Sequence, residues 1–192
     1  MKKLPVVLDL ETKYTFREFN DPKKLGVTVV GLFDYRDNKN KVFEEKEITK
    51  LFTLLESTSY IIGFNVKSFD LEVLQGYYPG KIQHFSTFDL LDDLKIKIGR
   101  RLSLNDFVFA TLGKKKTGHG LQAIELYKEG KMAELKKYCL DDVMLTKELF
   151  EFGIEKGEVM YLNEKGKIKV KVDWKKYLED SVKADTHLTL PF

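Results

Sequence analysis

Two acidic residues near the amino terminus, Asp9 and Glu11, stand two positions apart in the segment Val-Val-Leu-Asp-Leu-Glu-Thr. This segment is apolar and β-branched at its start, which predicts a strand over residues 6–12. Side chains alternate across a strand, so both carboxylates project from one face, roughly 6–7 Å apart along the chain. Each is costly to bury as an unpaired ion. A divalent cation held by hard oxygen ligands would relieve that cost, and an exposed strand end remains the alternative interpretation.

A third acid, Asp70, follows the continuous apolar run at residues 60–65. Such a run is typical of a central strand that is covered on both faces. The next segment predicts a helix over 68–74, with Ser68 as a candidate N-cap and Asp70 in the first turn. Asp70 is therefore expected at a junction between a strand and a helix.

A fourth acid, Asp142, lies on the longest predicted helix, which runs from Met132 to about Phe152 and ends at Gly153. Tyr138 is four residues earlier and so lies on the same face, one turn away. Asp141 is rotated about 100° from its neighbour by helix geometry. Asp142 borders the apolar stripe that docks the helix, and it is favoured over Asp141. That stripe consists of Leu135, Cys139, Val143, Thr146 and Leu149 or Phe150.

The remaining pattern predicts one α/β domain that positions these acids. Strands at 25–35 and 41–44 would form an antiparallel meander with the first strand, and parallel strands at 60–65 and 83–89 would extend the sheet. Helices are expected at 47–57, 90–98, 103–112 and 121–129, with Asp89 as an N-cap and a capping box at Ser103 and Asp106. Residues 158–162 and 167–172 flank a turn and predict a C-terminal hairpin.

Composition narrows the classes of protein. The chain has 192 residues, of which 43% are hydrophobic, enough for the core of one domain. The single cysteine, Cys139, rules out an internal disulfide and a cysteine-rich zinc site. The N-terminus lacks a signal-peptide pattern, and no apolar run approaches the roughly 20 residues that span a membrane. The expectation is a cytoplasmic protein whose net charge of +3 leaves nucleic-acid contacts to local clusters.

The three acidic segments, taken in order, resemble the DEDD superfamily of 3′–5′ exonucleases, which has a ribonuclease H-like fold. The motifs are Asp9-x-Glu11-Thr12, then Gly63-Phe64-Asn65 followed after three residues by Phe69-Asp70, and Tyr138-(x)3-Asp142, within residues 4–152. The last motif matches the tyrosine-bearing branch, because Lys137 stands where the other branch has histidine. Segments 103–106, 118–120, 138–139 and 142–143 also resemble exonucleases associated with helicases.

The resemblance implies two divalent ions, Mg²⁺ or Mn²⁺, held by Asp9, Glu11, Asp70 and Asp142. Asp9 would bridge both ions, Glu11 and Asp142 would complete one site, and Asp70 would hold the second ion. Tyr138 would orient the attacking water, and nucleoside 5′-monophosphates would leave from a 3′ end. Residues 1–153 would form the exonuclease domain, with 154–192 as a hairpin and tail packed on it. Single-stranded DNA is favoured over RNA, and a helicase or polymerase on another chain is a candidate partner.

Substrate contacts are sought in residues near these motifs. The candidates are Thr12, Asn65, Lys114, Lys116 and His119. Lysines position nucleic acid through phosphate without reading sequence, although a lysine run is also typical of a solvated loop. Lys167, Lys169 and Lys171 alternate along the hairpin, where they would guard an edge strand or contact nucleic acid. Two other functions stay open: a non-catalytic nucleic-acid-binding module that keeps the fold, and an endonuclease.

Overall fold

A mixed five-stranded sheet organises the computed structural model, which describes residues 3–115 and 120–179. Its strand order is β3-β2-β1-β4-β5. Strand β1 (Val6–Thr12) pairs antiparallel with β2 (Val27–Asp34) and parallel with β4 (Ile61–Gly63). Strand β3 (Lys39–Glu44) extends the meander and β5 (Thr87–Asp89) pairs parallel with β4. The predicted antiparallel meander followed by parallel strands is confirmed.

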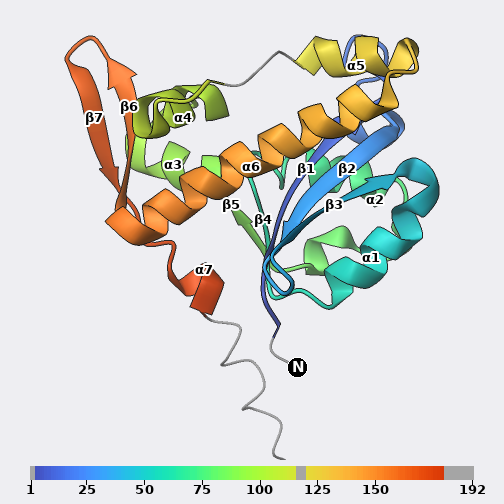
Figure 1. Ribbon diagram of the computed structural model, residues 1–192, viewed down its shortest axis with the longest axis horizontal. Coiled ribbons are helices and arrows are strands. Elements are labelled where there is room, and N and C mark those ends of the chain that lie inside the picture. Colours follow the sequence, from blue (N-terminus) through green and yellow to red (C-terminus); the bar gives the residue numbers. More distant parts are fainter. Residues whose placement is uncertain (1–2, 116–119, 180–192) are drawn as a thin grey trace, which may run out of the picture.

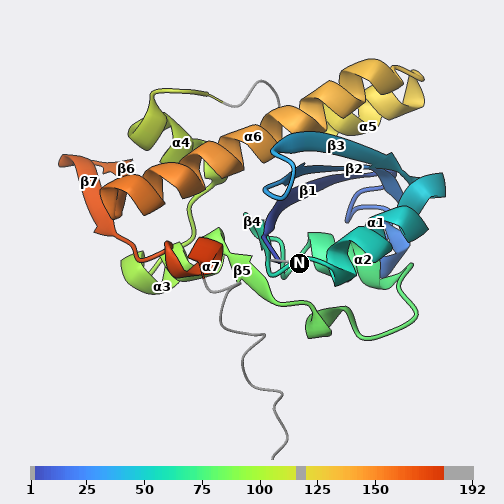
Figure 2. The same cartoon turned by 60° about the horizontal axis from the view of Figure 1, so that its bottom comes forward.

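Helices cover both faces of this sheet (Figures 1 and 2). Helices α1 (Ile48–Glu56) and α2 (Asp70–Gln75) pack on one face, where they meet Val6, Leu8 and Leu10 of β1. Helices α3 (Leu90–Ile98), α4 (Leu104–Leu112), α5 (Gly120–Lys128) and α6 (Met132–Lys156) lie on the other side. Because side chains alternate along β1, Asp9 and Glu11 project toward the face that α6 crosses.

Helix α6 continues past the position where the sequence predicts its end. Gly153 was expected to end it, but the helix runs to Lys156 and ends at Gly157, whose φ of 66° is left-handed. Gly153 instead makes room for a distant ring, since a Cβ there would lie 2.3 Å from Cε3 of Trp174. The glycine therefore serves packing, not helix termination, and the prediction from the local sequence was wrong.

The C-terminal hairpin packs against the end of α6 and against α4. It consists of β6 (Glu158–Asn163) and β7 (Gly166–Lys171), and the short helix α7 (Lys176–Glu179) follows. The Thr111 hydroxyl donates to the Met160 carbonyl, and the Met160 amide donates to the same hydroxyl at 2.8 Å. The Trp174 indole N–H donates to Asp93 at 2.8 Å. These contacts hold the predicted hairpin on the body of the protein.

The structure differs from several of the local predictions made from the sequence. Ser68 does not cap α2, because a turn intervenes: Asn65 has a left-handed φ of 68°, the Phe69 amide donates to the Asn65 carbonyl, and Phe69 takes the N-cap position. Only the last three residues of segment 83–89 form a strand, after a 3₁₀ turn at Ile82–His84. The Asp89 cap and the capping box at Ser103 are confirmed. Within the described ranges, no helix is long and apolar enough to cross a membrane.

Candidate metal and nucleic-acid site

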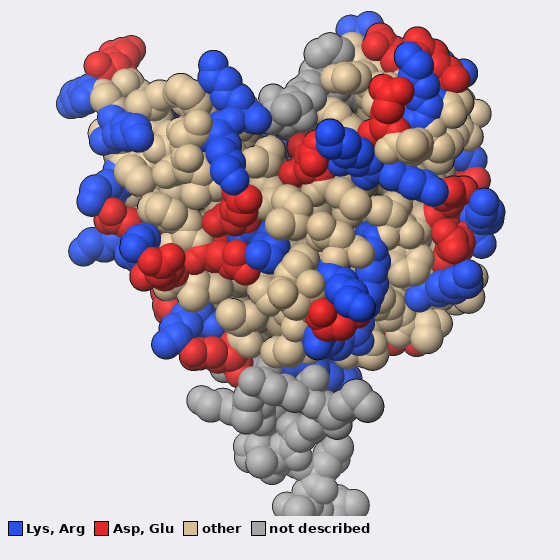
Figure 3. All heavy atoms as spheres, viewed as in Figure 1, with Lys and Arg blue, Asp and Glu red and all other residues tan. Residues whose placement is uncertain are grey.

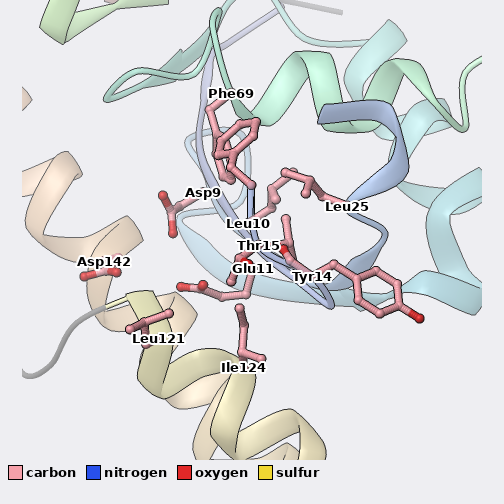
Figure 4. A pocket seen from close by; sticks show the side chains of 12 residues that line it. Asp9, Leu10, Glu11, Tyr14, Thr15, Leu25, Phe69, Leu121, Ile124 and Asp142 are labelled. Carbon is pink, nitrogen blue, oxygen red and sulfur yellow. Dashed lines mark hydrogen bonds between the residues drawn. The ribbon is translucent and has the colours of Figure 1, made fainter. Parts of the chain in front are cut away.

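Three carboxylates from opposite ends of the chain converge at one point. Asp9 and Glu11 come from β1 and Asp142 comes from the middle of α6, and one oxygen of each lies within 4.8 Å of the others. Figure 4 shows the three side chains turned toward a common space between the strand and the helix. Asp142 is almost fully buried, at 3% exposure. Three oxygen ligands at this spacing suit a hard divalent cation.

Close contact between α6 and the sheet brings Asp142 to β1. Asp9 is paired in register with Gly31 of β2, and α6 lies directly over that glycine. A Cβ at Gly31 would stand 2.9 Å from Cys139 Sγ and 3.2 Å from Val143 Cγ2. The Cys139 thiol donates to the Asp9 carbonyl at 3.5 Å. The missing side chain at Gly31 therefore sets the distance between the helix and the acidic strand.

Asp70 lies beside this set but is not one of the three. It is 3% exposed, and its Oδ1 accepts a hydrogen bond from the Leu10 amide at 3.0 Å. Burial raises the pKa of Asp70 well above its ordinary value, and the charge of Asp9 adds to the rise. Burial likewise raises the pKa of the Cys139 thiol, and the Asp9 and Glu11 charges raise it further. The acids thus create a concentrated negative field that a divalent cation would offset.

A cavity of about 470 Å³ opens next to the carboxylates. Its other walls are largely apolar: Phe16 and Phe69 have ring centroids 5.9 Å apart, and Leu121 and Ile124 of α5 also line it. The two threonines of its lining already donate, Thr12 to the Tyr14 carbonyl and Thr15 to Glu18. The full described lining is Asp9, Leu10, Glu11, Thr12, Tyr14, Thr15, Phe16, Leu25, Phe69, Leu121, Ile124 and Asp142.

Tyr138 occupies a different environment from the three acids. It is 5% exposed and packs with Ala123 and Leu126 of α5 and with Leu135 on its own helix. It is absent from the described lining of the cavity. The predicted helical neighbour of Asp142 is thus in place, one turn away, with its ring against α5.

The predicted substrate contacts lie in different places. Thr12 lines the cavity. Asn65 occupies the turn before α2, and its backbone amide donates to the Asp89 carboxylate at 2.9 Å. Lys114, just after α4, forms an ion pair of 2.6 Å with Glu148 of α6. Lys116 and His119 lie outside the described residues.

The aromatic and aliphatic residues that line the cavity, and the role of Asp89 in holding the turn before α2, were not predicted from the sequence. Phe16, Leu121 and Ile124 lie in segments whose proximity arises only from the tertiary fold; the apolar pair three apart on α5 was the available signal. Asp89 was expected only as a cap of α3, but its carboxylate also accepts hydrogen bonds from the Asn65 and Lys67 amides, at 2.9 and 3.0 Å. Asp89 therefore fixes the turn that delivers Asp70.

The chain is similar to known proteins in its sequence family and in its fold. Residues 6–152 match the RNase_H_2 family, described as part of the RNase_H superfamily. A family B DNA polymerase from the archaeon Pyrobaculum calidifontis is similar in fold, with a TM-score of 0.59 and 19% identity over 79% of this chain and 25% of that one. An E. coli ExoI–ssDNA complex in its zinc-bound form gives a TM-score of 0.48 and 16% identity over 80% of this chain and 41% of that one. This chain thus spans a quarter of the polymerase. A search of the curated proteins finds no match.

Proposed function

Since the chain belongs to the RNase H superfamily, we propose that it is a metal-dependent 3′–5′ exonuclease of the tyrosine-bearing DEDD branch. It hydrolyses phosphodiester bonds of nucleic acid to nucleoside 5′-monophosphates, with single-stranded DNA favoured over RNA. The observation that carries the proposal is the convergence of Asp9, Glu11 and Asp142 within 4.8 Å. A protein that only bound a polyanion would gain nothing from this cluster of negative charge, because the carboxylates would repel phosphate unless a cation lay between them.

The donor set fits Mg²⁺ or Mn²⁺, which prefer carboxylate oxygens. Asp9, Glu11 and Asp142 would hold one ion, and Asp70, buried within the field of Asp9, would hold a second with Asp9 as the shared ligand. When bound, two such ions stabilise the attacking and leaving oxygens of a phosphodiester. Tyr138 would orient the attacking water from α6. Asp89 would keep Asp70 in place through the turn at Asn65.

The cavity walls support an unpaired terminal nucleotide as the substrate. Bases stack on aromatic rings when they are not held in a duplex, and such stacking tolerates any sequence. Phe16 is 50% exposed and its ring lies 5.9 Å from that of Phe69, and both rings line the cavity that contains the acids. The hydroxyls of Thr12 and Thr15 already donate to protein groups. We therefore expect recognition by stacking, with little selection among bases.

Residues 1–153 would be the catalytic unit and residues 154–192 an accessory hairpin and tail. A helicase or a polymerase on another chain would present the 3′ end. We also propose a specific association with helicases.

The test uses purified protein with a 5′-labelled single-stranded oligonucleotide in Mg²⁺ or Mn²⁺. We expect shortening from the 3′ end, blocked by a 3′-terminal modification. Asp142→Asn should lower the cleavage rate at least about 100-fold, because it removes a charged ligand. Asp141→Asn, at the adjacent position of the helix, should keep most of the cleavage rate. Absence of cleavage with both metals would refute the proposal and favour a binding module. Cleavage of a circular substrate would indicate an endonuclease instead.

A further inference from the structure

The C-terminal hairpin carries a cationic face outside the matched family segment. Along β7, Lys167, Lys169 and Lys171 alternate with Ile168 and Val170. Val170 is buried in the core and all three lysines are exposed, so the lysines share the outward face of the hairpin. Figure 3 shows basic side chains along the edge of the molecule where the hairpin lies in Figure 1.

Charge at this end of the molecule is unbalanced. The loop between α3 and α4 adds two arginines, and the hairpin turn adds a fourth lysine. Together the loop at residues 99–103 and the hairpin at residues 158–171 hold six cations, against the two acids Glu158 and Glu164: Arg100, Arg101, Lys165, Lys167, Lys169 and Lys171. Within the part of the chain that the structure describes, only Lys169 of the four lysines forms an ion pair, with Glu158 at 2.7 Å.

A groove joins the arginine loop to the hairpin. It has a volume of about 400 Å³ and includes Arg100, Tyr161, Leu162 and Lys165 in its lining. The Arg100 guanidinium lies 5.2 Å from the centre of the Tyr161 ring, and Leu162 is 43% exposed. Leu162 pairs with Lys167 and so shares the face of the lysines, whereas Tyr161 pairs with Ile168 and lies on the opposite face of the hairpin. Lysines that only guard an edge strand need no exposed apolar neighbour, whereas a flexible polyanion with apolar bases would use cations and apolar surface together.

We infer that this face, the cationic hairpin face, binds the phosphates of the single-stranded substrate upstream of the end being cleaved. The inference rests on the proposed function. Alternate residues of a strand are about 6.8 Å apart, twice the roughly 3.4 Å rise of one nucleic-acid strand, so successive lysines would meet every second phosphate. From Asp142 to the end of α6 at Lys156 is about 21 Å at 1.5 Å per residue. Roughly six stacked nucleotides span that distance.

The test separates this surface from the cleavage site by measuring binding without turnover. In an Asp9→Asn background, fluorescence anisotropy is recorded for a 30-nucleotide single strand and for a trinucleotide across a salt series. The variant Lys165→Gln/Lys167→Gln/Lys171→Gln keeps the Lys169 ion pair. A charge-matched control replaces Lys24, Lys39 and Lys81, exposed lysines on other elements.

Loss of three phosphate contacts should reduce the slope of log affinity against log salt by about 2 for the long strand. The trinucleotide should bind equally well to both variants, because it does not reach the hairpin. An unchanged slope would overturn the inference, as would an equal effect of the control triple or an equal effect on the trinucleotide. Aggregation of the hairpin variant with an unchanged slope would assign the lysines to edge protection instead. Because none of these readouts needs cleavage, a failed nuclease assay would not be mistaken for failure of this surface.

Discussion

Replacing Gly31 by alanine should separate the acids while leaving each of them in the chain. The new Cβ would lie 2.9 Å from Cys139 Sγ and 3.2 Å from Val143 Cγ2. Restoring even a 3.4 Å separation from the sulfur requires α6 to move by about 0.5 Å, since dense packing leaves no free volume to absorb the methyl group. That movement carries Asp142 away from Asp9 and Glu11.

The magnitude follows from two opposing effects on stability and one on the site. Overpacking costs about 1–3 kcal/mol, and replacing a strand glycine returns about 0.5–1 kcal/mol. The net loss of about 1–2 kcal/mol lowers the melting temperature by several degrees for a chain of this size. Misplacement by about 1 Å costs roughly 100-fold in rate, so a shift of half that size should cost roughly 10-fold. Metal affinity should fall with it.

A second substitution tests the cause. Cys139→Ala removes the sulfur that the new methyl group meets, so the double variant Gly31→Ala/Cys139→Ala should regain most of the activity that the single variant loses. Thermal unfolding with and without Mn²⁺ measures the site independently of cleavage, because a ligand that binds only the folded state raises its stability. Cys139→Ala alone is the control. Full metal stabilisation of Gly31→Ala, or no recovery in the double variant, would refute the reasoning.

Three further outcomes follow from features of the same structure. Glu11→Gln should weaken one metal site more than the other, so metal titration should show one lost and one retained transition; uniform weakening would contradict the assigned roles. Gly153→Ala should lower the free energy of unfolding by about 2 kcal/mol through overlap with the indole ring packed there, measured by urea denaturation, and an unchanged value would refute that contact. Burial alone would raise the pKa of Asp34, but hydrogen bonds from Arg36 and Lys41 hold it below its ordinary value of 3.8. Its contribution, about 2 kcal/mol, is therefore present above pH 3.8 and lost as pH falls further, so the stability gap between wild type and Asp34→Asn should narrow between pH 7 and pH 3; a constant gap would contradict this.

Local geometry was sufficient to predict part of the site from the sequence. Alternation along a strand placed Asp9 and Glu11 on one face, and helical rotation separated Asp142 from Asp141; the structure places Asp142 with the other two acids. Both inferences use periods that the backbone imposes regardless of the tertiary fold. The central strands β1, β2 and β4 followed because they are apolar runs divided by clear turns.

Features that depend on contacts between distant parts of the chain could not be predicted from the local sequence. Gly153 resembled a helix end because its partner, Trp174, lies in a later segment that only folding brings to it. The cavity walls combine Phe16, before β2, with Leu121 on α5, and no local period relates the two. Lys114, a candidate phosphate contact, pairs with Glu148 on a distant helix. Long-range packing decided each of these outcomes.

The division of the acids between β1 and α6 has a consequence for the synthesis and folding of the polypeptide. Asp9 is made near the start of the matched segment and Asp142 near its end. A ribosome-bound chain therefore exposes two carboxylates long before the third exists, and any native-state opening that undocks α6 dismantles the set again. The carboxylate cluster exists only in the folded protein, so misfolded or nascent copies lack the assembled acid set.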